Sequence, residues 1–263
     1  MRKRAVLRWI VALAVATLLF YACGRAHVPP AVASVFLDPV ERQAVTVDIV
    51  CDYGGGSTGC TQDSLGELLR TLVPTLPAGS LLRLQGMTDS VLTEHELARY
   101  TITQSHKRTR RALEHHTEQD TNAVLTTFLP AAAPVFDHPD RHASPIAETI
   151  ARSVIAGPLP RTAQHIYVLT DARQVSRSAL GDLDFECGDL PSVDKFSDGL
   201  RELIAPSTFT GVAIHFAYVR LEPVENNRCT ATLQQYVATR ELWTKSLEKL
   251  GASVTWSMGP VQE

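Results

Sequence analysis

The chain is 263 residues long, with 44% apolar and 20% charged residues. This composition is that of an ordinary globular protein and excludes a disordered chain. The formal net charge of −3 predicts no general affinity for nucleic acid, because nucleic-acid binders usually carry a strong basic excess.

The first 23 residues have the layout of a signal peptide or membrane anchor. Basic residues at positions 2–4 precede an unbroken apolar run from Trp9 to Ala22, and Cys23 follows. The Ala22–Cys23 step resembles the cleavage site of bacterial lipoproteins, at which the cysteine is lipidated. An uncleaved anchor and a simple secretory signal are the alternatives. The run from Trp9 to Ala22 is short for a membrane span, which needs roughly 20 apolar residues. Each alternative predicts a protein of the bacterial cell envelope, on the periplasmic side.

Residues 24–43 form a predicted linker, because three prolines in this segment discourage regular structure. One domain over residues 44–263 is expected to follow. Its first element is a β-branched run at 45–50, which predicts a strand. Leucines at helical spacing then predict a helix over 63–72, with Asp63 as its N-cap.

The middle of the domain is expected to contain a strand and two helices. Residues 80–86 predict the strand, and residues 105–128 predict a long helix with a charged, solvated face. Prolines predict a break in regular structure over 130–142. A further helix is predicted over 144–156, with Ser144 as its N-cap.

The last part of the domain alternates strands and helices again. Near-continuous apolar runs at 165–170 and 211–219 predict strands that are buried on both faces. Between them, the acidic stretch 182–198 is expected to be an irregular surface insertion. An amphipathic helix over 236–250 and a strand over 252–257 complete the chain. This alternation predicts an α/β fold: a doubly wound, mostly parallel sheet with helices on both faces, similar to the Rossmann fold.

Four cysteines follow Cys23, and an even number in an exported chain suggests two disulfides, with three possible connectivities. Cys51 and Cys60 flank one glycine-rich loop, which makes them natural partners. Cys187 and Cys229 would then form the second pair.

Oxygen-bearing side chains follow the predicted strands at the edge where open α/β sheets bind ligands. Asp52 and the loop that contains Ser57 follow the first strand, and Thr170 and Asp171 follow the strand at 165–170. Ser144 stands at the start of a helix. Carboxylates and hydroxyls from neighbouring loops are suitable ligands for a hard cation such as Mg²⁺.

These residues resemble the metal-ion-dependent adhesion site of the von Willebrand factor type A (VWA) domain. In that family the first strand ends in Asp-x-Ser-x-Ser, a second loop gives a Thr, and a later strand ends in Thr-Asp-Gly. Asp52 matches the first Asp, Ser144 falls where the Thr should be, and Thr170-Asp171 matches the later pair. The resemblance covers roughly residues 44–257, and in the family such a site binds a partner's carboxylate through the metal.

The chain departs from the VWA pattern at several positions. Gly54 and Gly56 stand where the two serines should be, so only Ser57 and Thr58 could supply hydroxyls from this loop. Ala172 replaces the usual Gly. The resemblance therefore supports the fold better than it supports a complete metal site.

The same loop, DYGGGSTG, is also similar to the phosphate-binding loop of actin-like phosphotransferases of the exopolyphosphatase group. Glycines allow a phosphate to approach the backbone amides closely. In that family the loop is the turn of a β-hairpin, so a strand over 63–72 would favour this alternative and a helix would favour the VWA-like one.

The sequence contains neither a GxSxG nucleophile motif nor a paired-carboxylate signature. We therefore expect a non-catalytic module that binds a protein partner and is attached to the membrane through its N-terminus. If a divalent cation takes part, its expected ligands are Asp52, Ser57, Ser144 and Asp171. A phosphate-ester hydrolase is the alternative.

Overall fold

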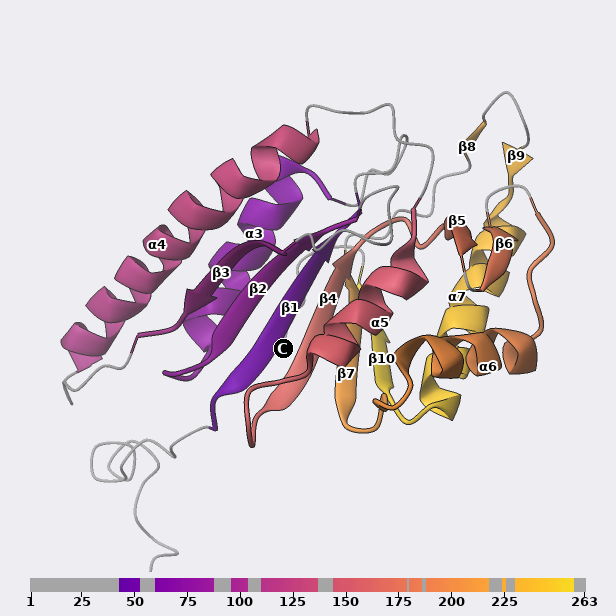
Figure 1. Ribbon diagram of the computed structural model, residues 1–263. Coiled ribbons are helices and arrows are strands. Elements are labelled where there is room, and N and C mark those ends of the chain that lie inside the picture. Colours follow the sequence, from indigo (N-terminus) through magenta and orange to yellow (C-terminus); the bar gives the residue numbers. More distant parts are fainter. Residues whose placement is uncertain are drawn as a thin grey trace, which may run out of the picture. The chain divides into compact units, whose positions relative to one another are not determined.

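Six strands form one sheet in the order β10-β7-β4-β1-β2-β3 (Figure 1). Their bounds are β1 Val45–Cys51, β2 Leu81–Gly86, β3 Glu96–Thr101, β4 Ala163–Leu169, β7 Val212–Ala217 and β10 Ser253–Trp256. All neighbouring strands are parallel except β2 and β3, which are antiparallel. The winding of the chain reverses between β1 and β4, as in a doubly wound, Rossmann-like sheet. The predicted α/β class with a mostly parallel sheet is confirmed.

The computed structural model describes residues 43–52, 60–87, 96–103, 110–136, 144–178, 180–185, 188–217, 224–225 and 230–257. Within these ranges, no helix has the length and apolar character that crossing a membrane requires. The predicted signal or anchor lies outside them, as do Cys23, Ser57, Cys187 and Cys229.

Helices cover the sheet on both faces. Helices α3 (Gln62–Leu72) and α4 (Arg110–Phe136) share one core with β1 and β2, and η2 (Val73–Thr75) extends α3. Helices α5 (Ile146–Ala156), α6 (Val193–Ile204) and α7 (Leu233–Lys249) share the other core with β4 and β7. Side chains along a strand alternate between the two faces. Accordingly Ile49 of β1 belongs to the first core, whereas Val50 belongs to the second.

Two short pairs of strands lie outside the main sheet. The hairpin β5 (Val175–Ser178) and β6 (Gly181–Asp184) follows β4, and β8 (Val224–Glu225) pairs with β9 (Thr230–Ala231) before α7. The predicted irregular insertion at 182–198 is therefore wrong in part. It contains β6 and the start of α6, which Ser192 caps by accepting a hydrogen bond from the backbone amide of Lys195.

The predicted break at 130–142 is also wrong over its first seven residues, because α4 continues through Pro130 and Pro134 to Phe136. A proline inside a helix removes a hydrogen bond and disfavours the helix. Tertiary packing outweighs this cost, since Phe128 and Ala132 of α4 are completely buried in the first core. The edge strand β3 was not predicted, and the N-cap of α3 is Thr61 instead of Asp63.

Candidate functional site

Asp52 stands at the carboxyl edge of the sheet, where the winding reverses. Its backbone amide donates a hydrogen bond to the carbonyl of Leu169, with 3.0 Å between N and O, so it continues the pairing of β1 with β4. The residue is completely buried. Open α/β sheets bind ligands at this point, outside the carboxyl ends of the two diverging strands.

Two hydroxyl groups hold the carboxylate of Asp52. Ser144 Oγ donates to Oδ1 at 3.0 Å, and Thr170 Oγ1 donates to Oδ2 at 2.6 Å. These donors lie 92 and 118 residues away in the chain. The structure thus brings together the ends of three segments that the sequence singled out.

Ser144 has a different local role from the predicted one. The N-cap of α5 is Pro145, which makes no side-chain capping bond. Ser144 instead pairs through its backbone with Val175: its amide donates to the Val175 carbonyl at 2.8 Å, and its carbonyl accepts from the Val175 amide at 3.2 Å. This bridge leaves the Ser144 hydroxyl directed at Asp52.

The turn after β4 is built around Thr170, Asp171 and Ala172. The Ala172 amide donates to Thr170 Oγ1 at 3.0 Å, and Trp243 Nε1 of α7 donates to the Ala172 carbonyl at 3.1 Å. Ala172 is buried and has a φ of 65°, a conformation that favours glycine. The Gly of the family's Thr-Asp-Gly sequence would therefore suit this position without strain.

Asp171 is engaged by Arg173. Asp171 Oδ1 accepts a hydrogen bond from the Arg173 amide at 3.0 Å, and Arg173 Nε lies 3.8 Å from Oδ2. The guanidinium therefore compensates much of the negative charge that Asp171 would offer to a cation.

The fit of a divalent cation follows from these contacts. Asp52, Ser144 and Thr170 provide only oxygen donors, which is the chemistry that Mg²⁺ prefers. However, the described residues contain no cluster of three or more His, Cys, Asp or Glu side chains that could hold a metal ion. The remaining predicted ligand, Ser57, lies outside the described residues. The described residues thus offer oxygen donors at this edge, and the Asp171 carboxylate among them is paired with Arg173.

A second polar cluster positions the start of α5 next to Asp52. Gln174 donates from Nε2 to Glu148 at 2.8 Å and accepts at Oε1 from the Ala147 amide at 2.8 Å. Ser176 donates to the other oxygen of Glu148, also at 2.8 Å. Burial lowers the pKa of the neighbouring Arg152, and the charge of Glu148 opposes this shift. The buried carboxylate of Glu148 thus joins α5 to the segment after β4.

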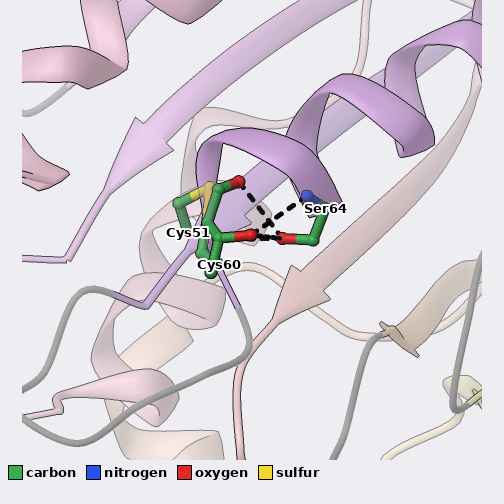
Figure 2. The surroundings of a disulfide bond; sticks show 4 residues. Cys51, Cys60 and Ser64 are labelled. Carbon is green, nitrogen blue, oxygen red and sulfur yellow. Dashed lines mark hydrogen bonds between the residues drawn. A yellow bond between two sulfur atoms is a disulfide. The ribbon is translucent and has the colours of Figure 1, made fainter.

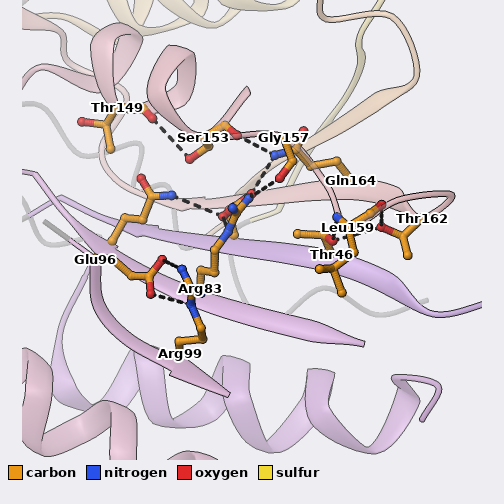
Figure 3. A network of polar contacts seen from close by, with 12 residues as sticks. Thr46, Arg83, Glu96, Arg99, Thr149, Ser153, Gly157, Leu159, Thr162 and Gln164 are labelled. Carbon is orange, nitrogen blue, oxygen red and sulfur yellow. Dashed lines mark hydrogen bonds and ion pairs between the residues drawn. The ribbon is translucent and has the colours of Figure 1, made fainter. Parts of the chain in front are cut away.

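A third cluster lies deeper under α5 and joins three strands (Figure 3). Arg83 of β2 forms two hydrogen bonds with the carboxylate of Asp48 in β1, at 2.6 and 2.9 Å. Gln85 and Gln164 donate to the same carboxylate at 3.2 and 2.8 Å. Burial raises the pKa of Asp48, and the hydrogen bonds and charge of Arg83 oppose this shift. The cluster fixes β2 and β4 against β1 at a position four residues before Asp52.

A disulfide joins the end of β1 to the residue before the N-cap of α3. Cys51, the last residue of β1, is bonded to Cys60, which is the pairing that the sequence predicts (Figure 2). Thr61 and Ser64 then cap α3 reciprocally, with the Ser64 amide donating to Thr61 Oγ1 at 3.1 Å and the Thr61 amide donating to Ser64 Oγ at 2.8 Å. Both ends of the loop after Asp52 are therefore anchored.

The histidines of β4 and β7 lie on the other face of the sheet. His165 Nδ1 is 3.3 Å from His215 Nε2, and the two rings are stacked. Since strand residues alternate, these imidazoles point away from Thr170. They cannot act as a base for its hydroxyl group.

No known protein family and no curated protein matches the chain. The site is thus interpreted from its own residues. The sequence singled out Asp52, Ser144, Thr170 and Asp171, and the structure bonds Ser144 and Thr170 to Asp52 while Asp171 contacts Arg173. Sequence reasoning missed Arg173 and the cluster around Glu148. The adjacency of Arg173 to Asp171 was the available signal for the first of these.

Proposed function

We propose that this protein is a non-catalytic binding module of the bacterial cell envelope, which engages a protein partner at the edge around Asp52. The observation that carries the proposal is the convergence of Ser144 and Thr170 on Asp52. These two hydrogen bonds hold three loop ends together at the winding reversal, which is the usual ligand position of such sheets.

Two further features favour a VWA-like interpretation. The first is the order of chemistry along the chain: an Asp after the first strand, a hydroxyl residue in a second loop, and Thr-Asp after a later strand. The second is the positive φ of Ala172, because a glycine stands at the equivalent position of the family pattern. Neither feature depends on a bound metal.

A divalent cation such as Mg²⁺ is the second part of the proposal. Asp52, Ser57, Ser144 and Asp171 would hold it, and it would offer a coordination position to an Asp or Glu of the partner. Isothermal titration calorimetry of the full chain with Mg²⁺ or Mn²⁺ tests this part. Heat of binding that is lost in Asp171→Ala supports it, whereas no binding by the unaltered chain leaves a metal-independent binding edge.

The binding function itself is tested with Asp52→Asn, which keeps the shape of the side chain but places an amide between two hydroxyl donors. The full chain, Asp52→Asn and the exposed control Asp198→Asn are used to retrieve partners from bacterial envelope extracts. We expect a partner that is retained by the first and third proteins and lost by Asp52→Asn. Thermal unfolding followed by circular dichroism checks that all three are folded. Equal retention by all three would contradict the proposal.

The phosphotransferase alternative needs a strand after the glycine-rich loop. The segment over 62–72 is helix α3 instead. A helix at this position favours the VWA-like interpretation, so we do not propose the alternative. Hydrolysis of ATP or polyphosphate by the purified chain would reinstate it.

A further inference from the structure

Two large apolar side chains are exposed one helical turn apart on α7. Leu233 is 55% exposed and Val237 is 53% exposed. Residues four apart lie on the same side of a helix, so these two side chains form one apolar surface. Single exposed apolar residues need no explanation, but adjacent ones next to a functional site suggest a binding surface.

An arginine and a tyrosine extend this surface. Tyr236 and Arg240 follow Leu233 at three and seven positions, which places them on the same side of α7. We call Leu233, Tyr236, Val237 and Arg240 the α7 face. The guanidinium carbon of Arg240 lies 5.4 Å from the centre of the Trp256 ring, which orients an exposed cation. The first turn of α7 contains no acidic residue.

Helix α7 also packs against the turn that follows β4. Trp243 of the same helix donates a hydrogen bond to the Ala172 carbonyl at 3.1 Å. The pKa of Tyr236 is raised to about 12 by burial, and Arg240, Asp171 and Arg173 also act on it electrostatically. Tyr236 is thus close enough to interact electrostatically both with Arg240 and with the charged residues that follow β4. Arg173 is paired with Asp171 and is mostly buried, so Arg240 supplies the exposed positive charge beside Leu233 and Val237.

From this combination we infer that the α7 face binds an acidic and apolar segment of a partner protein. Apolar side chains of the segment would cover Leu233 and Val237, and a carboxylate would pair with Arg240. Arginine forms two parallel hydrogen bonds with a carboxylate, and a stacked guanidinium is already oriented for them. The inference rests on the proposed function and adds the chemistry of the partner to it.

A random peptide display library, presented to the immobilised full chain, tests the inference. Peptides are selected on the unaltered protein, and their dissociation constants are then measured by fluorescence polarisation. We expect the enriched peptides to place Asp or Glu next to Leu, Ile, Phe or Trp. Val237→Glu and Arg240→Glu should each weaken their binding by about tenfold or more, as for central interface residues.

Ile155→Glu is the matched control, because Ile155 is 54% exposed on another helix and the substitution changes charge and apolar area equally. It should leave binding unchanged. Enriched peptides without acidic residues, or equal binding to all variants, would overturn the inference. A concentration-dependent dimer in sedimentation that Val237→Glu abolishes would also overturn it, since a second copy would then occupy the face.

Asp52→Asn separates this inference from the proposed function. Peptides that lose affinity for Asp52→Asn but not for Val237→Glu would leave the proposed function standing and exclude the α7 face. Peptides that lose affinity for Val237→Glu alone would support the α7 face and remove Asp52 from the binding surface.

Discussion

At the scale of single residues, a buried ion pair beneath α5 joins β1 to β2. Asp48 is completely buried and Arg83 is nearly so, yet both carry charge-assisted hydrogen bonds. Such a pair contributes little net stability compared with apolar residues, but breaking it leaves an uncompensated charge in the interior. Asp52 follows the end of the same strand, and its two hydroxyl donors come from the segments before α5 and after β4.

Arg83→Met should lower the free energy of unfolding by about 3–5 kcal/mol, because it leaves Asp48 buried without its cation. Asp48→Leu combined with Arg83→Met should cost less than the sum of the two single substitutions. The control is Arg99→Met, which removes an exposed ion pair with Glu96 and should cost below about 1 kcal/mol. Urea unfolding measures all four proteins, and additive effects would show that the pair is not coupled.

The histidine pair on the opposite face predicts a dependence of stability on pH. Burial, with the charge of His165, lowers the pKa of His215 from 6.5 to about 4. His165, Tyr167 and Thr255 contact this ring. Below pH 6.5 the unfolded chain takes up a proton that folded His215 does not. Its contribution is therefore complete above pH 6.5 and is lost as the pH falls towards 4.

The loss amounts to at most about 3 kcal/mol, since one unit of pKa corresponds to about 1.4 kcal/mol. Urea unfolding at pH 7 and pH 4.5 measures it. In His215→Asn the difference between the two pH values should shrink by most of this amount. The exposed control His115→Gln should keep the difference of the unaltered protein. The same difference in all three proteins would exclude His215 as its source.

At the scale of elements, the spacing of apolar residues predicted several strands and helices correctly. The apolar runs at 45–50 and 165–170 became adjacent central strands, and the leucines at 65, 68, 69 and 72 became the buried side of α3. Local sequence patterns gave a wrong prediction where a contact between distant residues determines the role of a side chain. Ser144 is a residue type that often caps helices, but its hydroxyl donates a hydrogen bond to Asp52, which lies 92 residues earlier in the chain. A pattern of neighbouring residues cannot predict a hydrogen bond between residues so far apart in the chain.

The prolines in α4 allow a test of how much their low helix propensity destabilises a helix that tertiary packing holds in place. Pro130 is exposed, so its ring does not contribute to the core. Pro130→Ala should restore a backbone hydrogen bond and raise the free energy of unfolding by about 1–3 kcal/mol. The exposed neighbour Asn122→Ala is the control and should change stability by less. Thermal unfolding measures both, and an unchanged or lower stability of Pro130→Ala would contradict this reasoning.

The disulfide between β1 and the start of α3 closes a short loop. Replacing both Cys51 and Cys60 with alanine should lower the free energy of unfolding by about 2–3 kcal/mol, because the unfolded chain regains freedom. Unfolding in urea without reductant measures this loss. A further decrease when reductant is added to the double variant would report the predicted pair of Cys187 and Cys229. No decrease in either experiment would contradict a stabilising role for the first disulfide.

At the scale of the whole molecule, the chain predicted the class of fold more completely than the site. Alternating strands and helices predict the sheet, because each parallel crossover requires a helix. Asp52 and Thr170 lie side by side because β1 and β4 are neighbours in the sheet. The amino-acid composition of the strands does not reveal which strands are neighbours. The compensation of Asp171 by Arg173 depends on a turn geometry that becomes visible only in three dimensions.

The position of β1 has a mechanical consequence. The strand begins at Val45, where the preceding chain joins the domain, and it ends beside Asp52 at the opposite edge of the sheet. A pull between a tether on the N-terminal side and a partner held at Asp52 would therefore run along the length of β1. The load would pass through the covalent backbone of β1, and its hydrogen bonds to parallel β2 and β4 would not have to break. Such a geometry suits a connector that must withstand force.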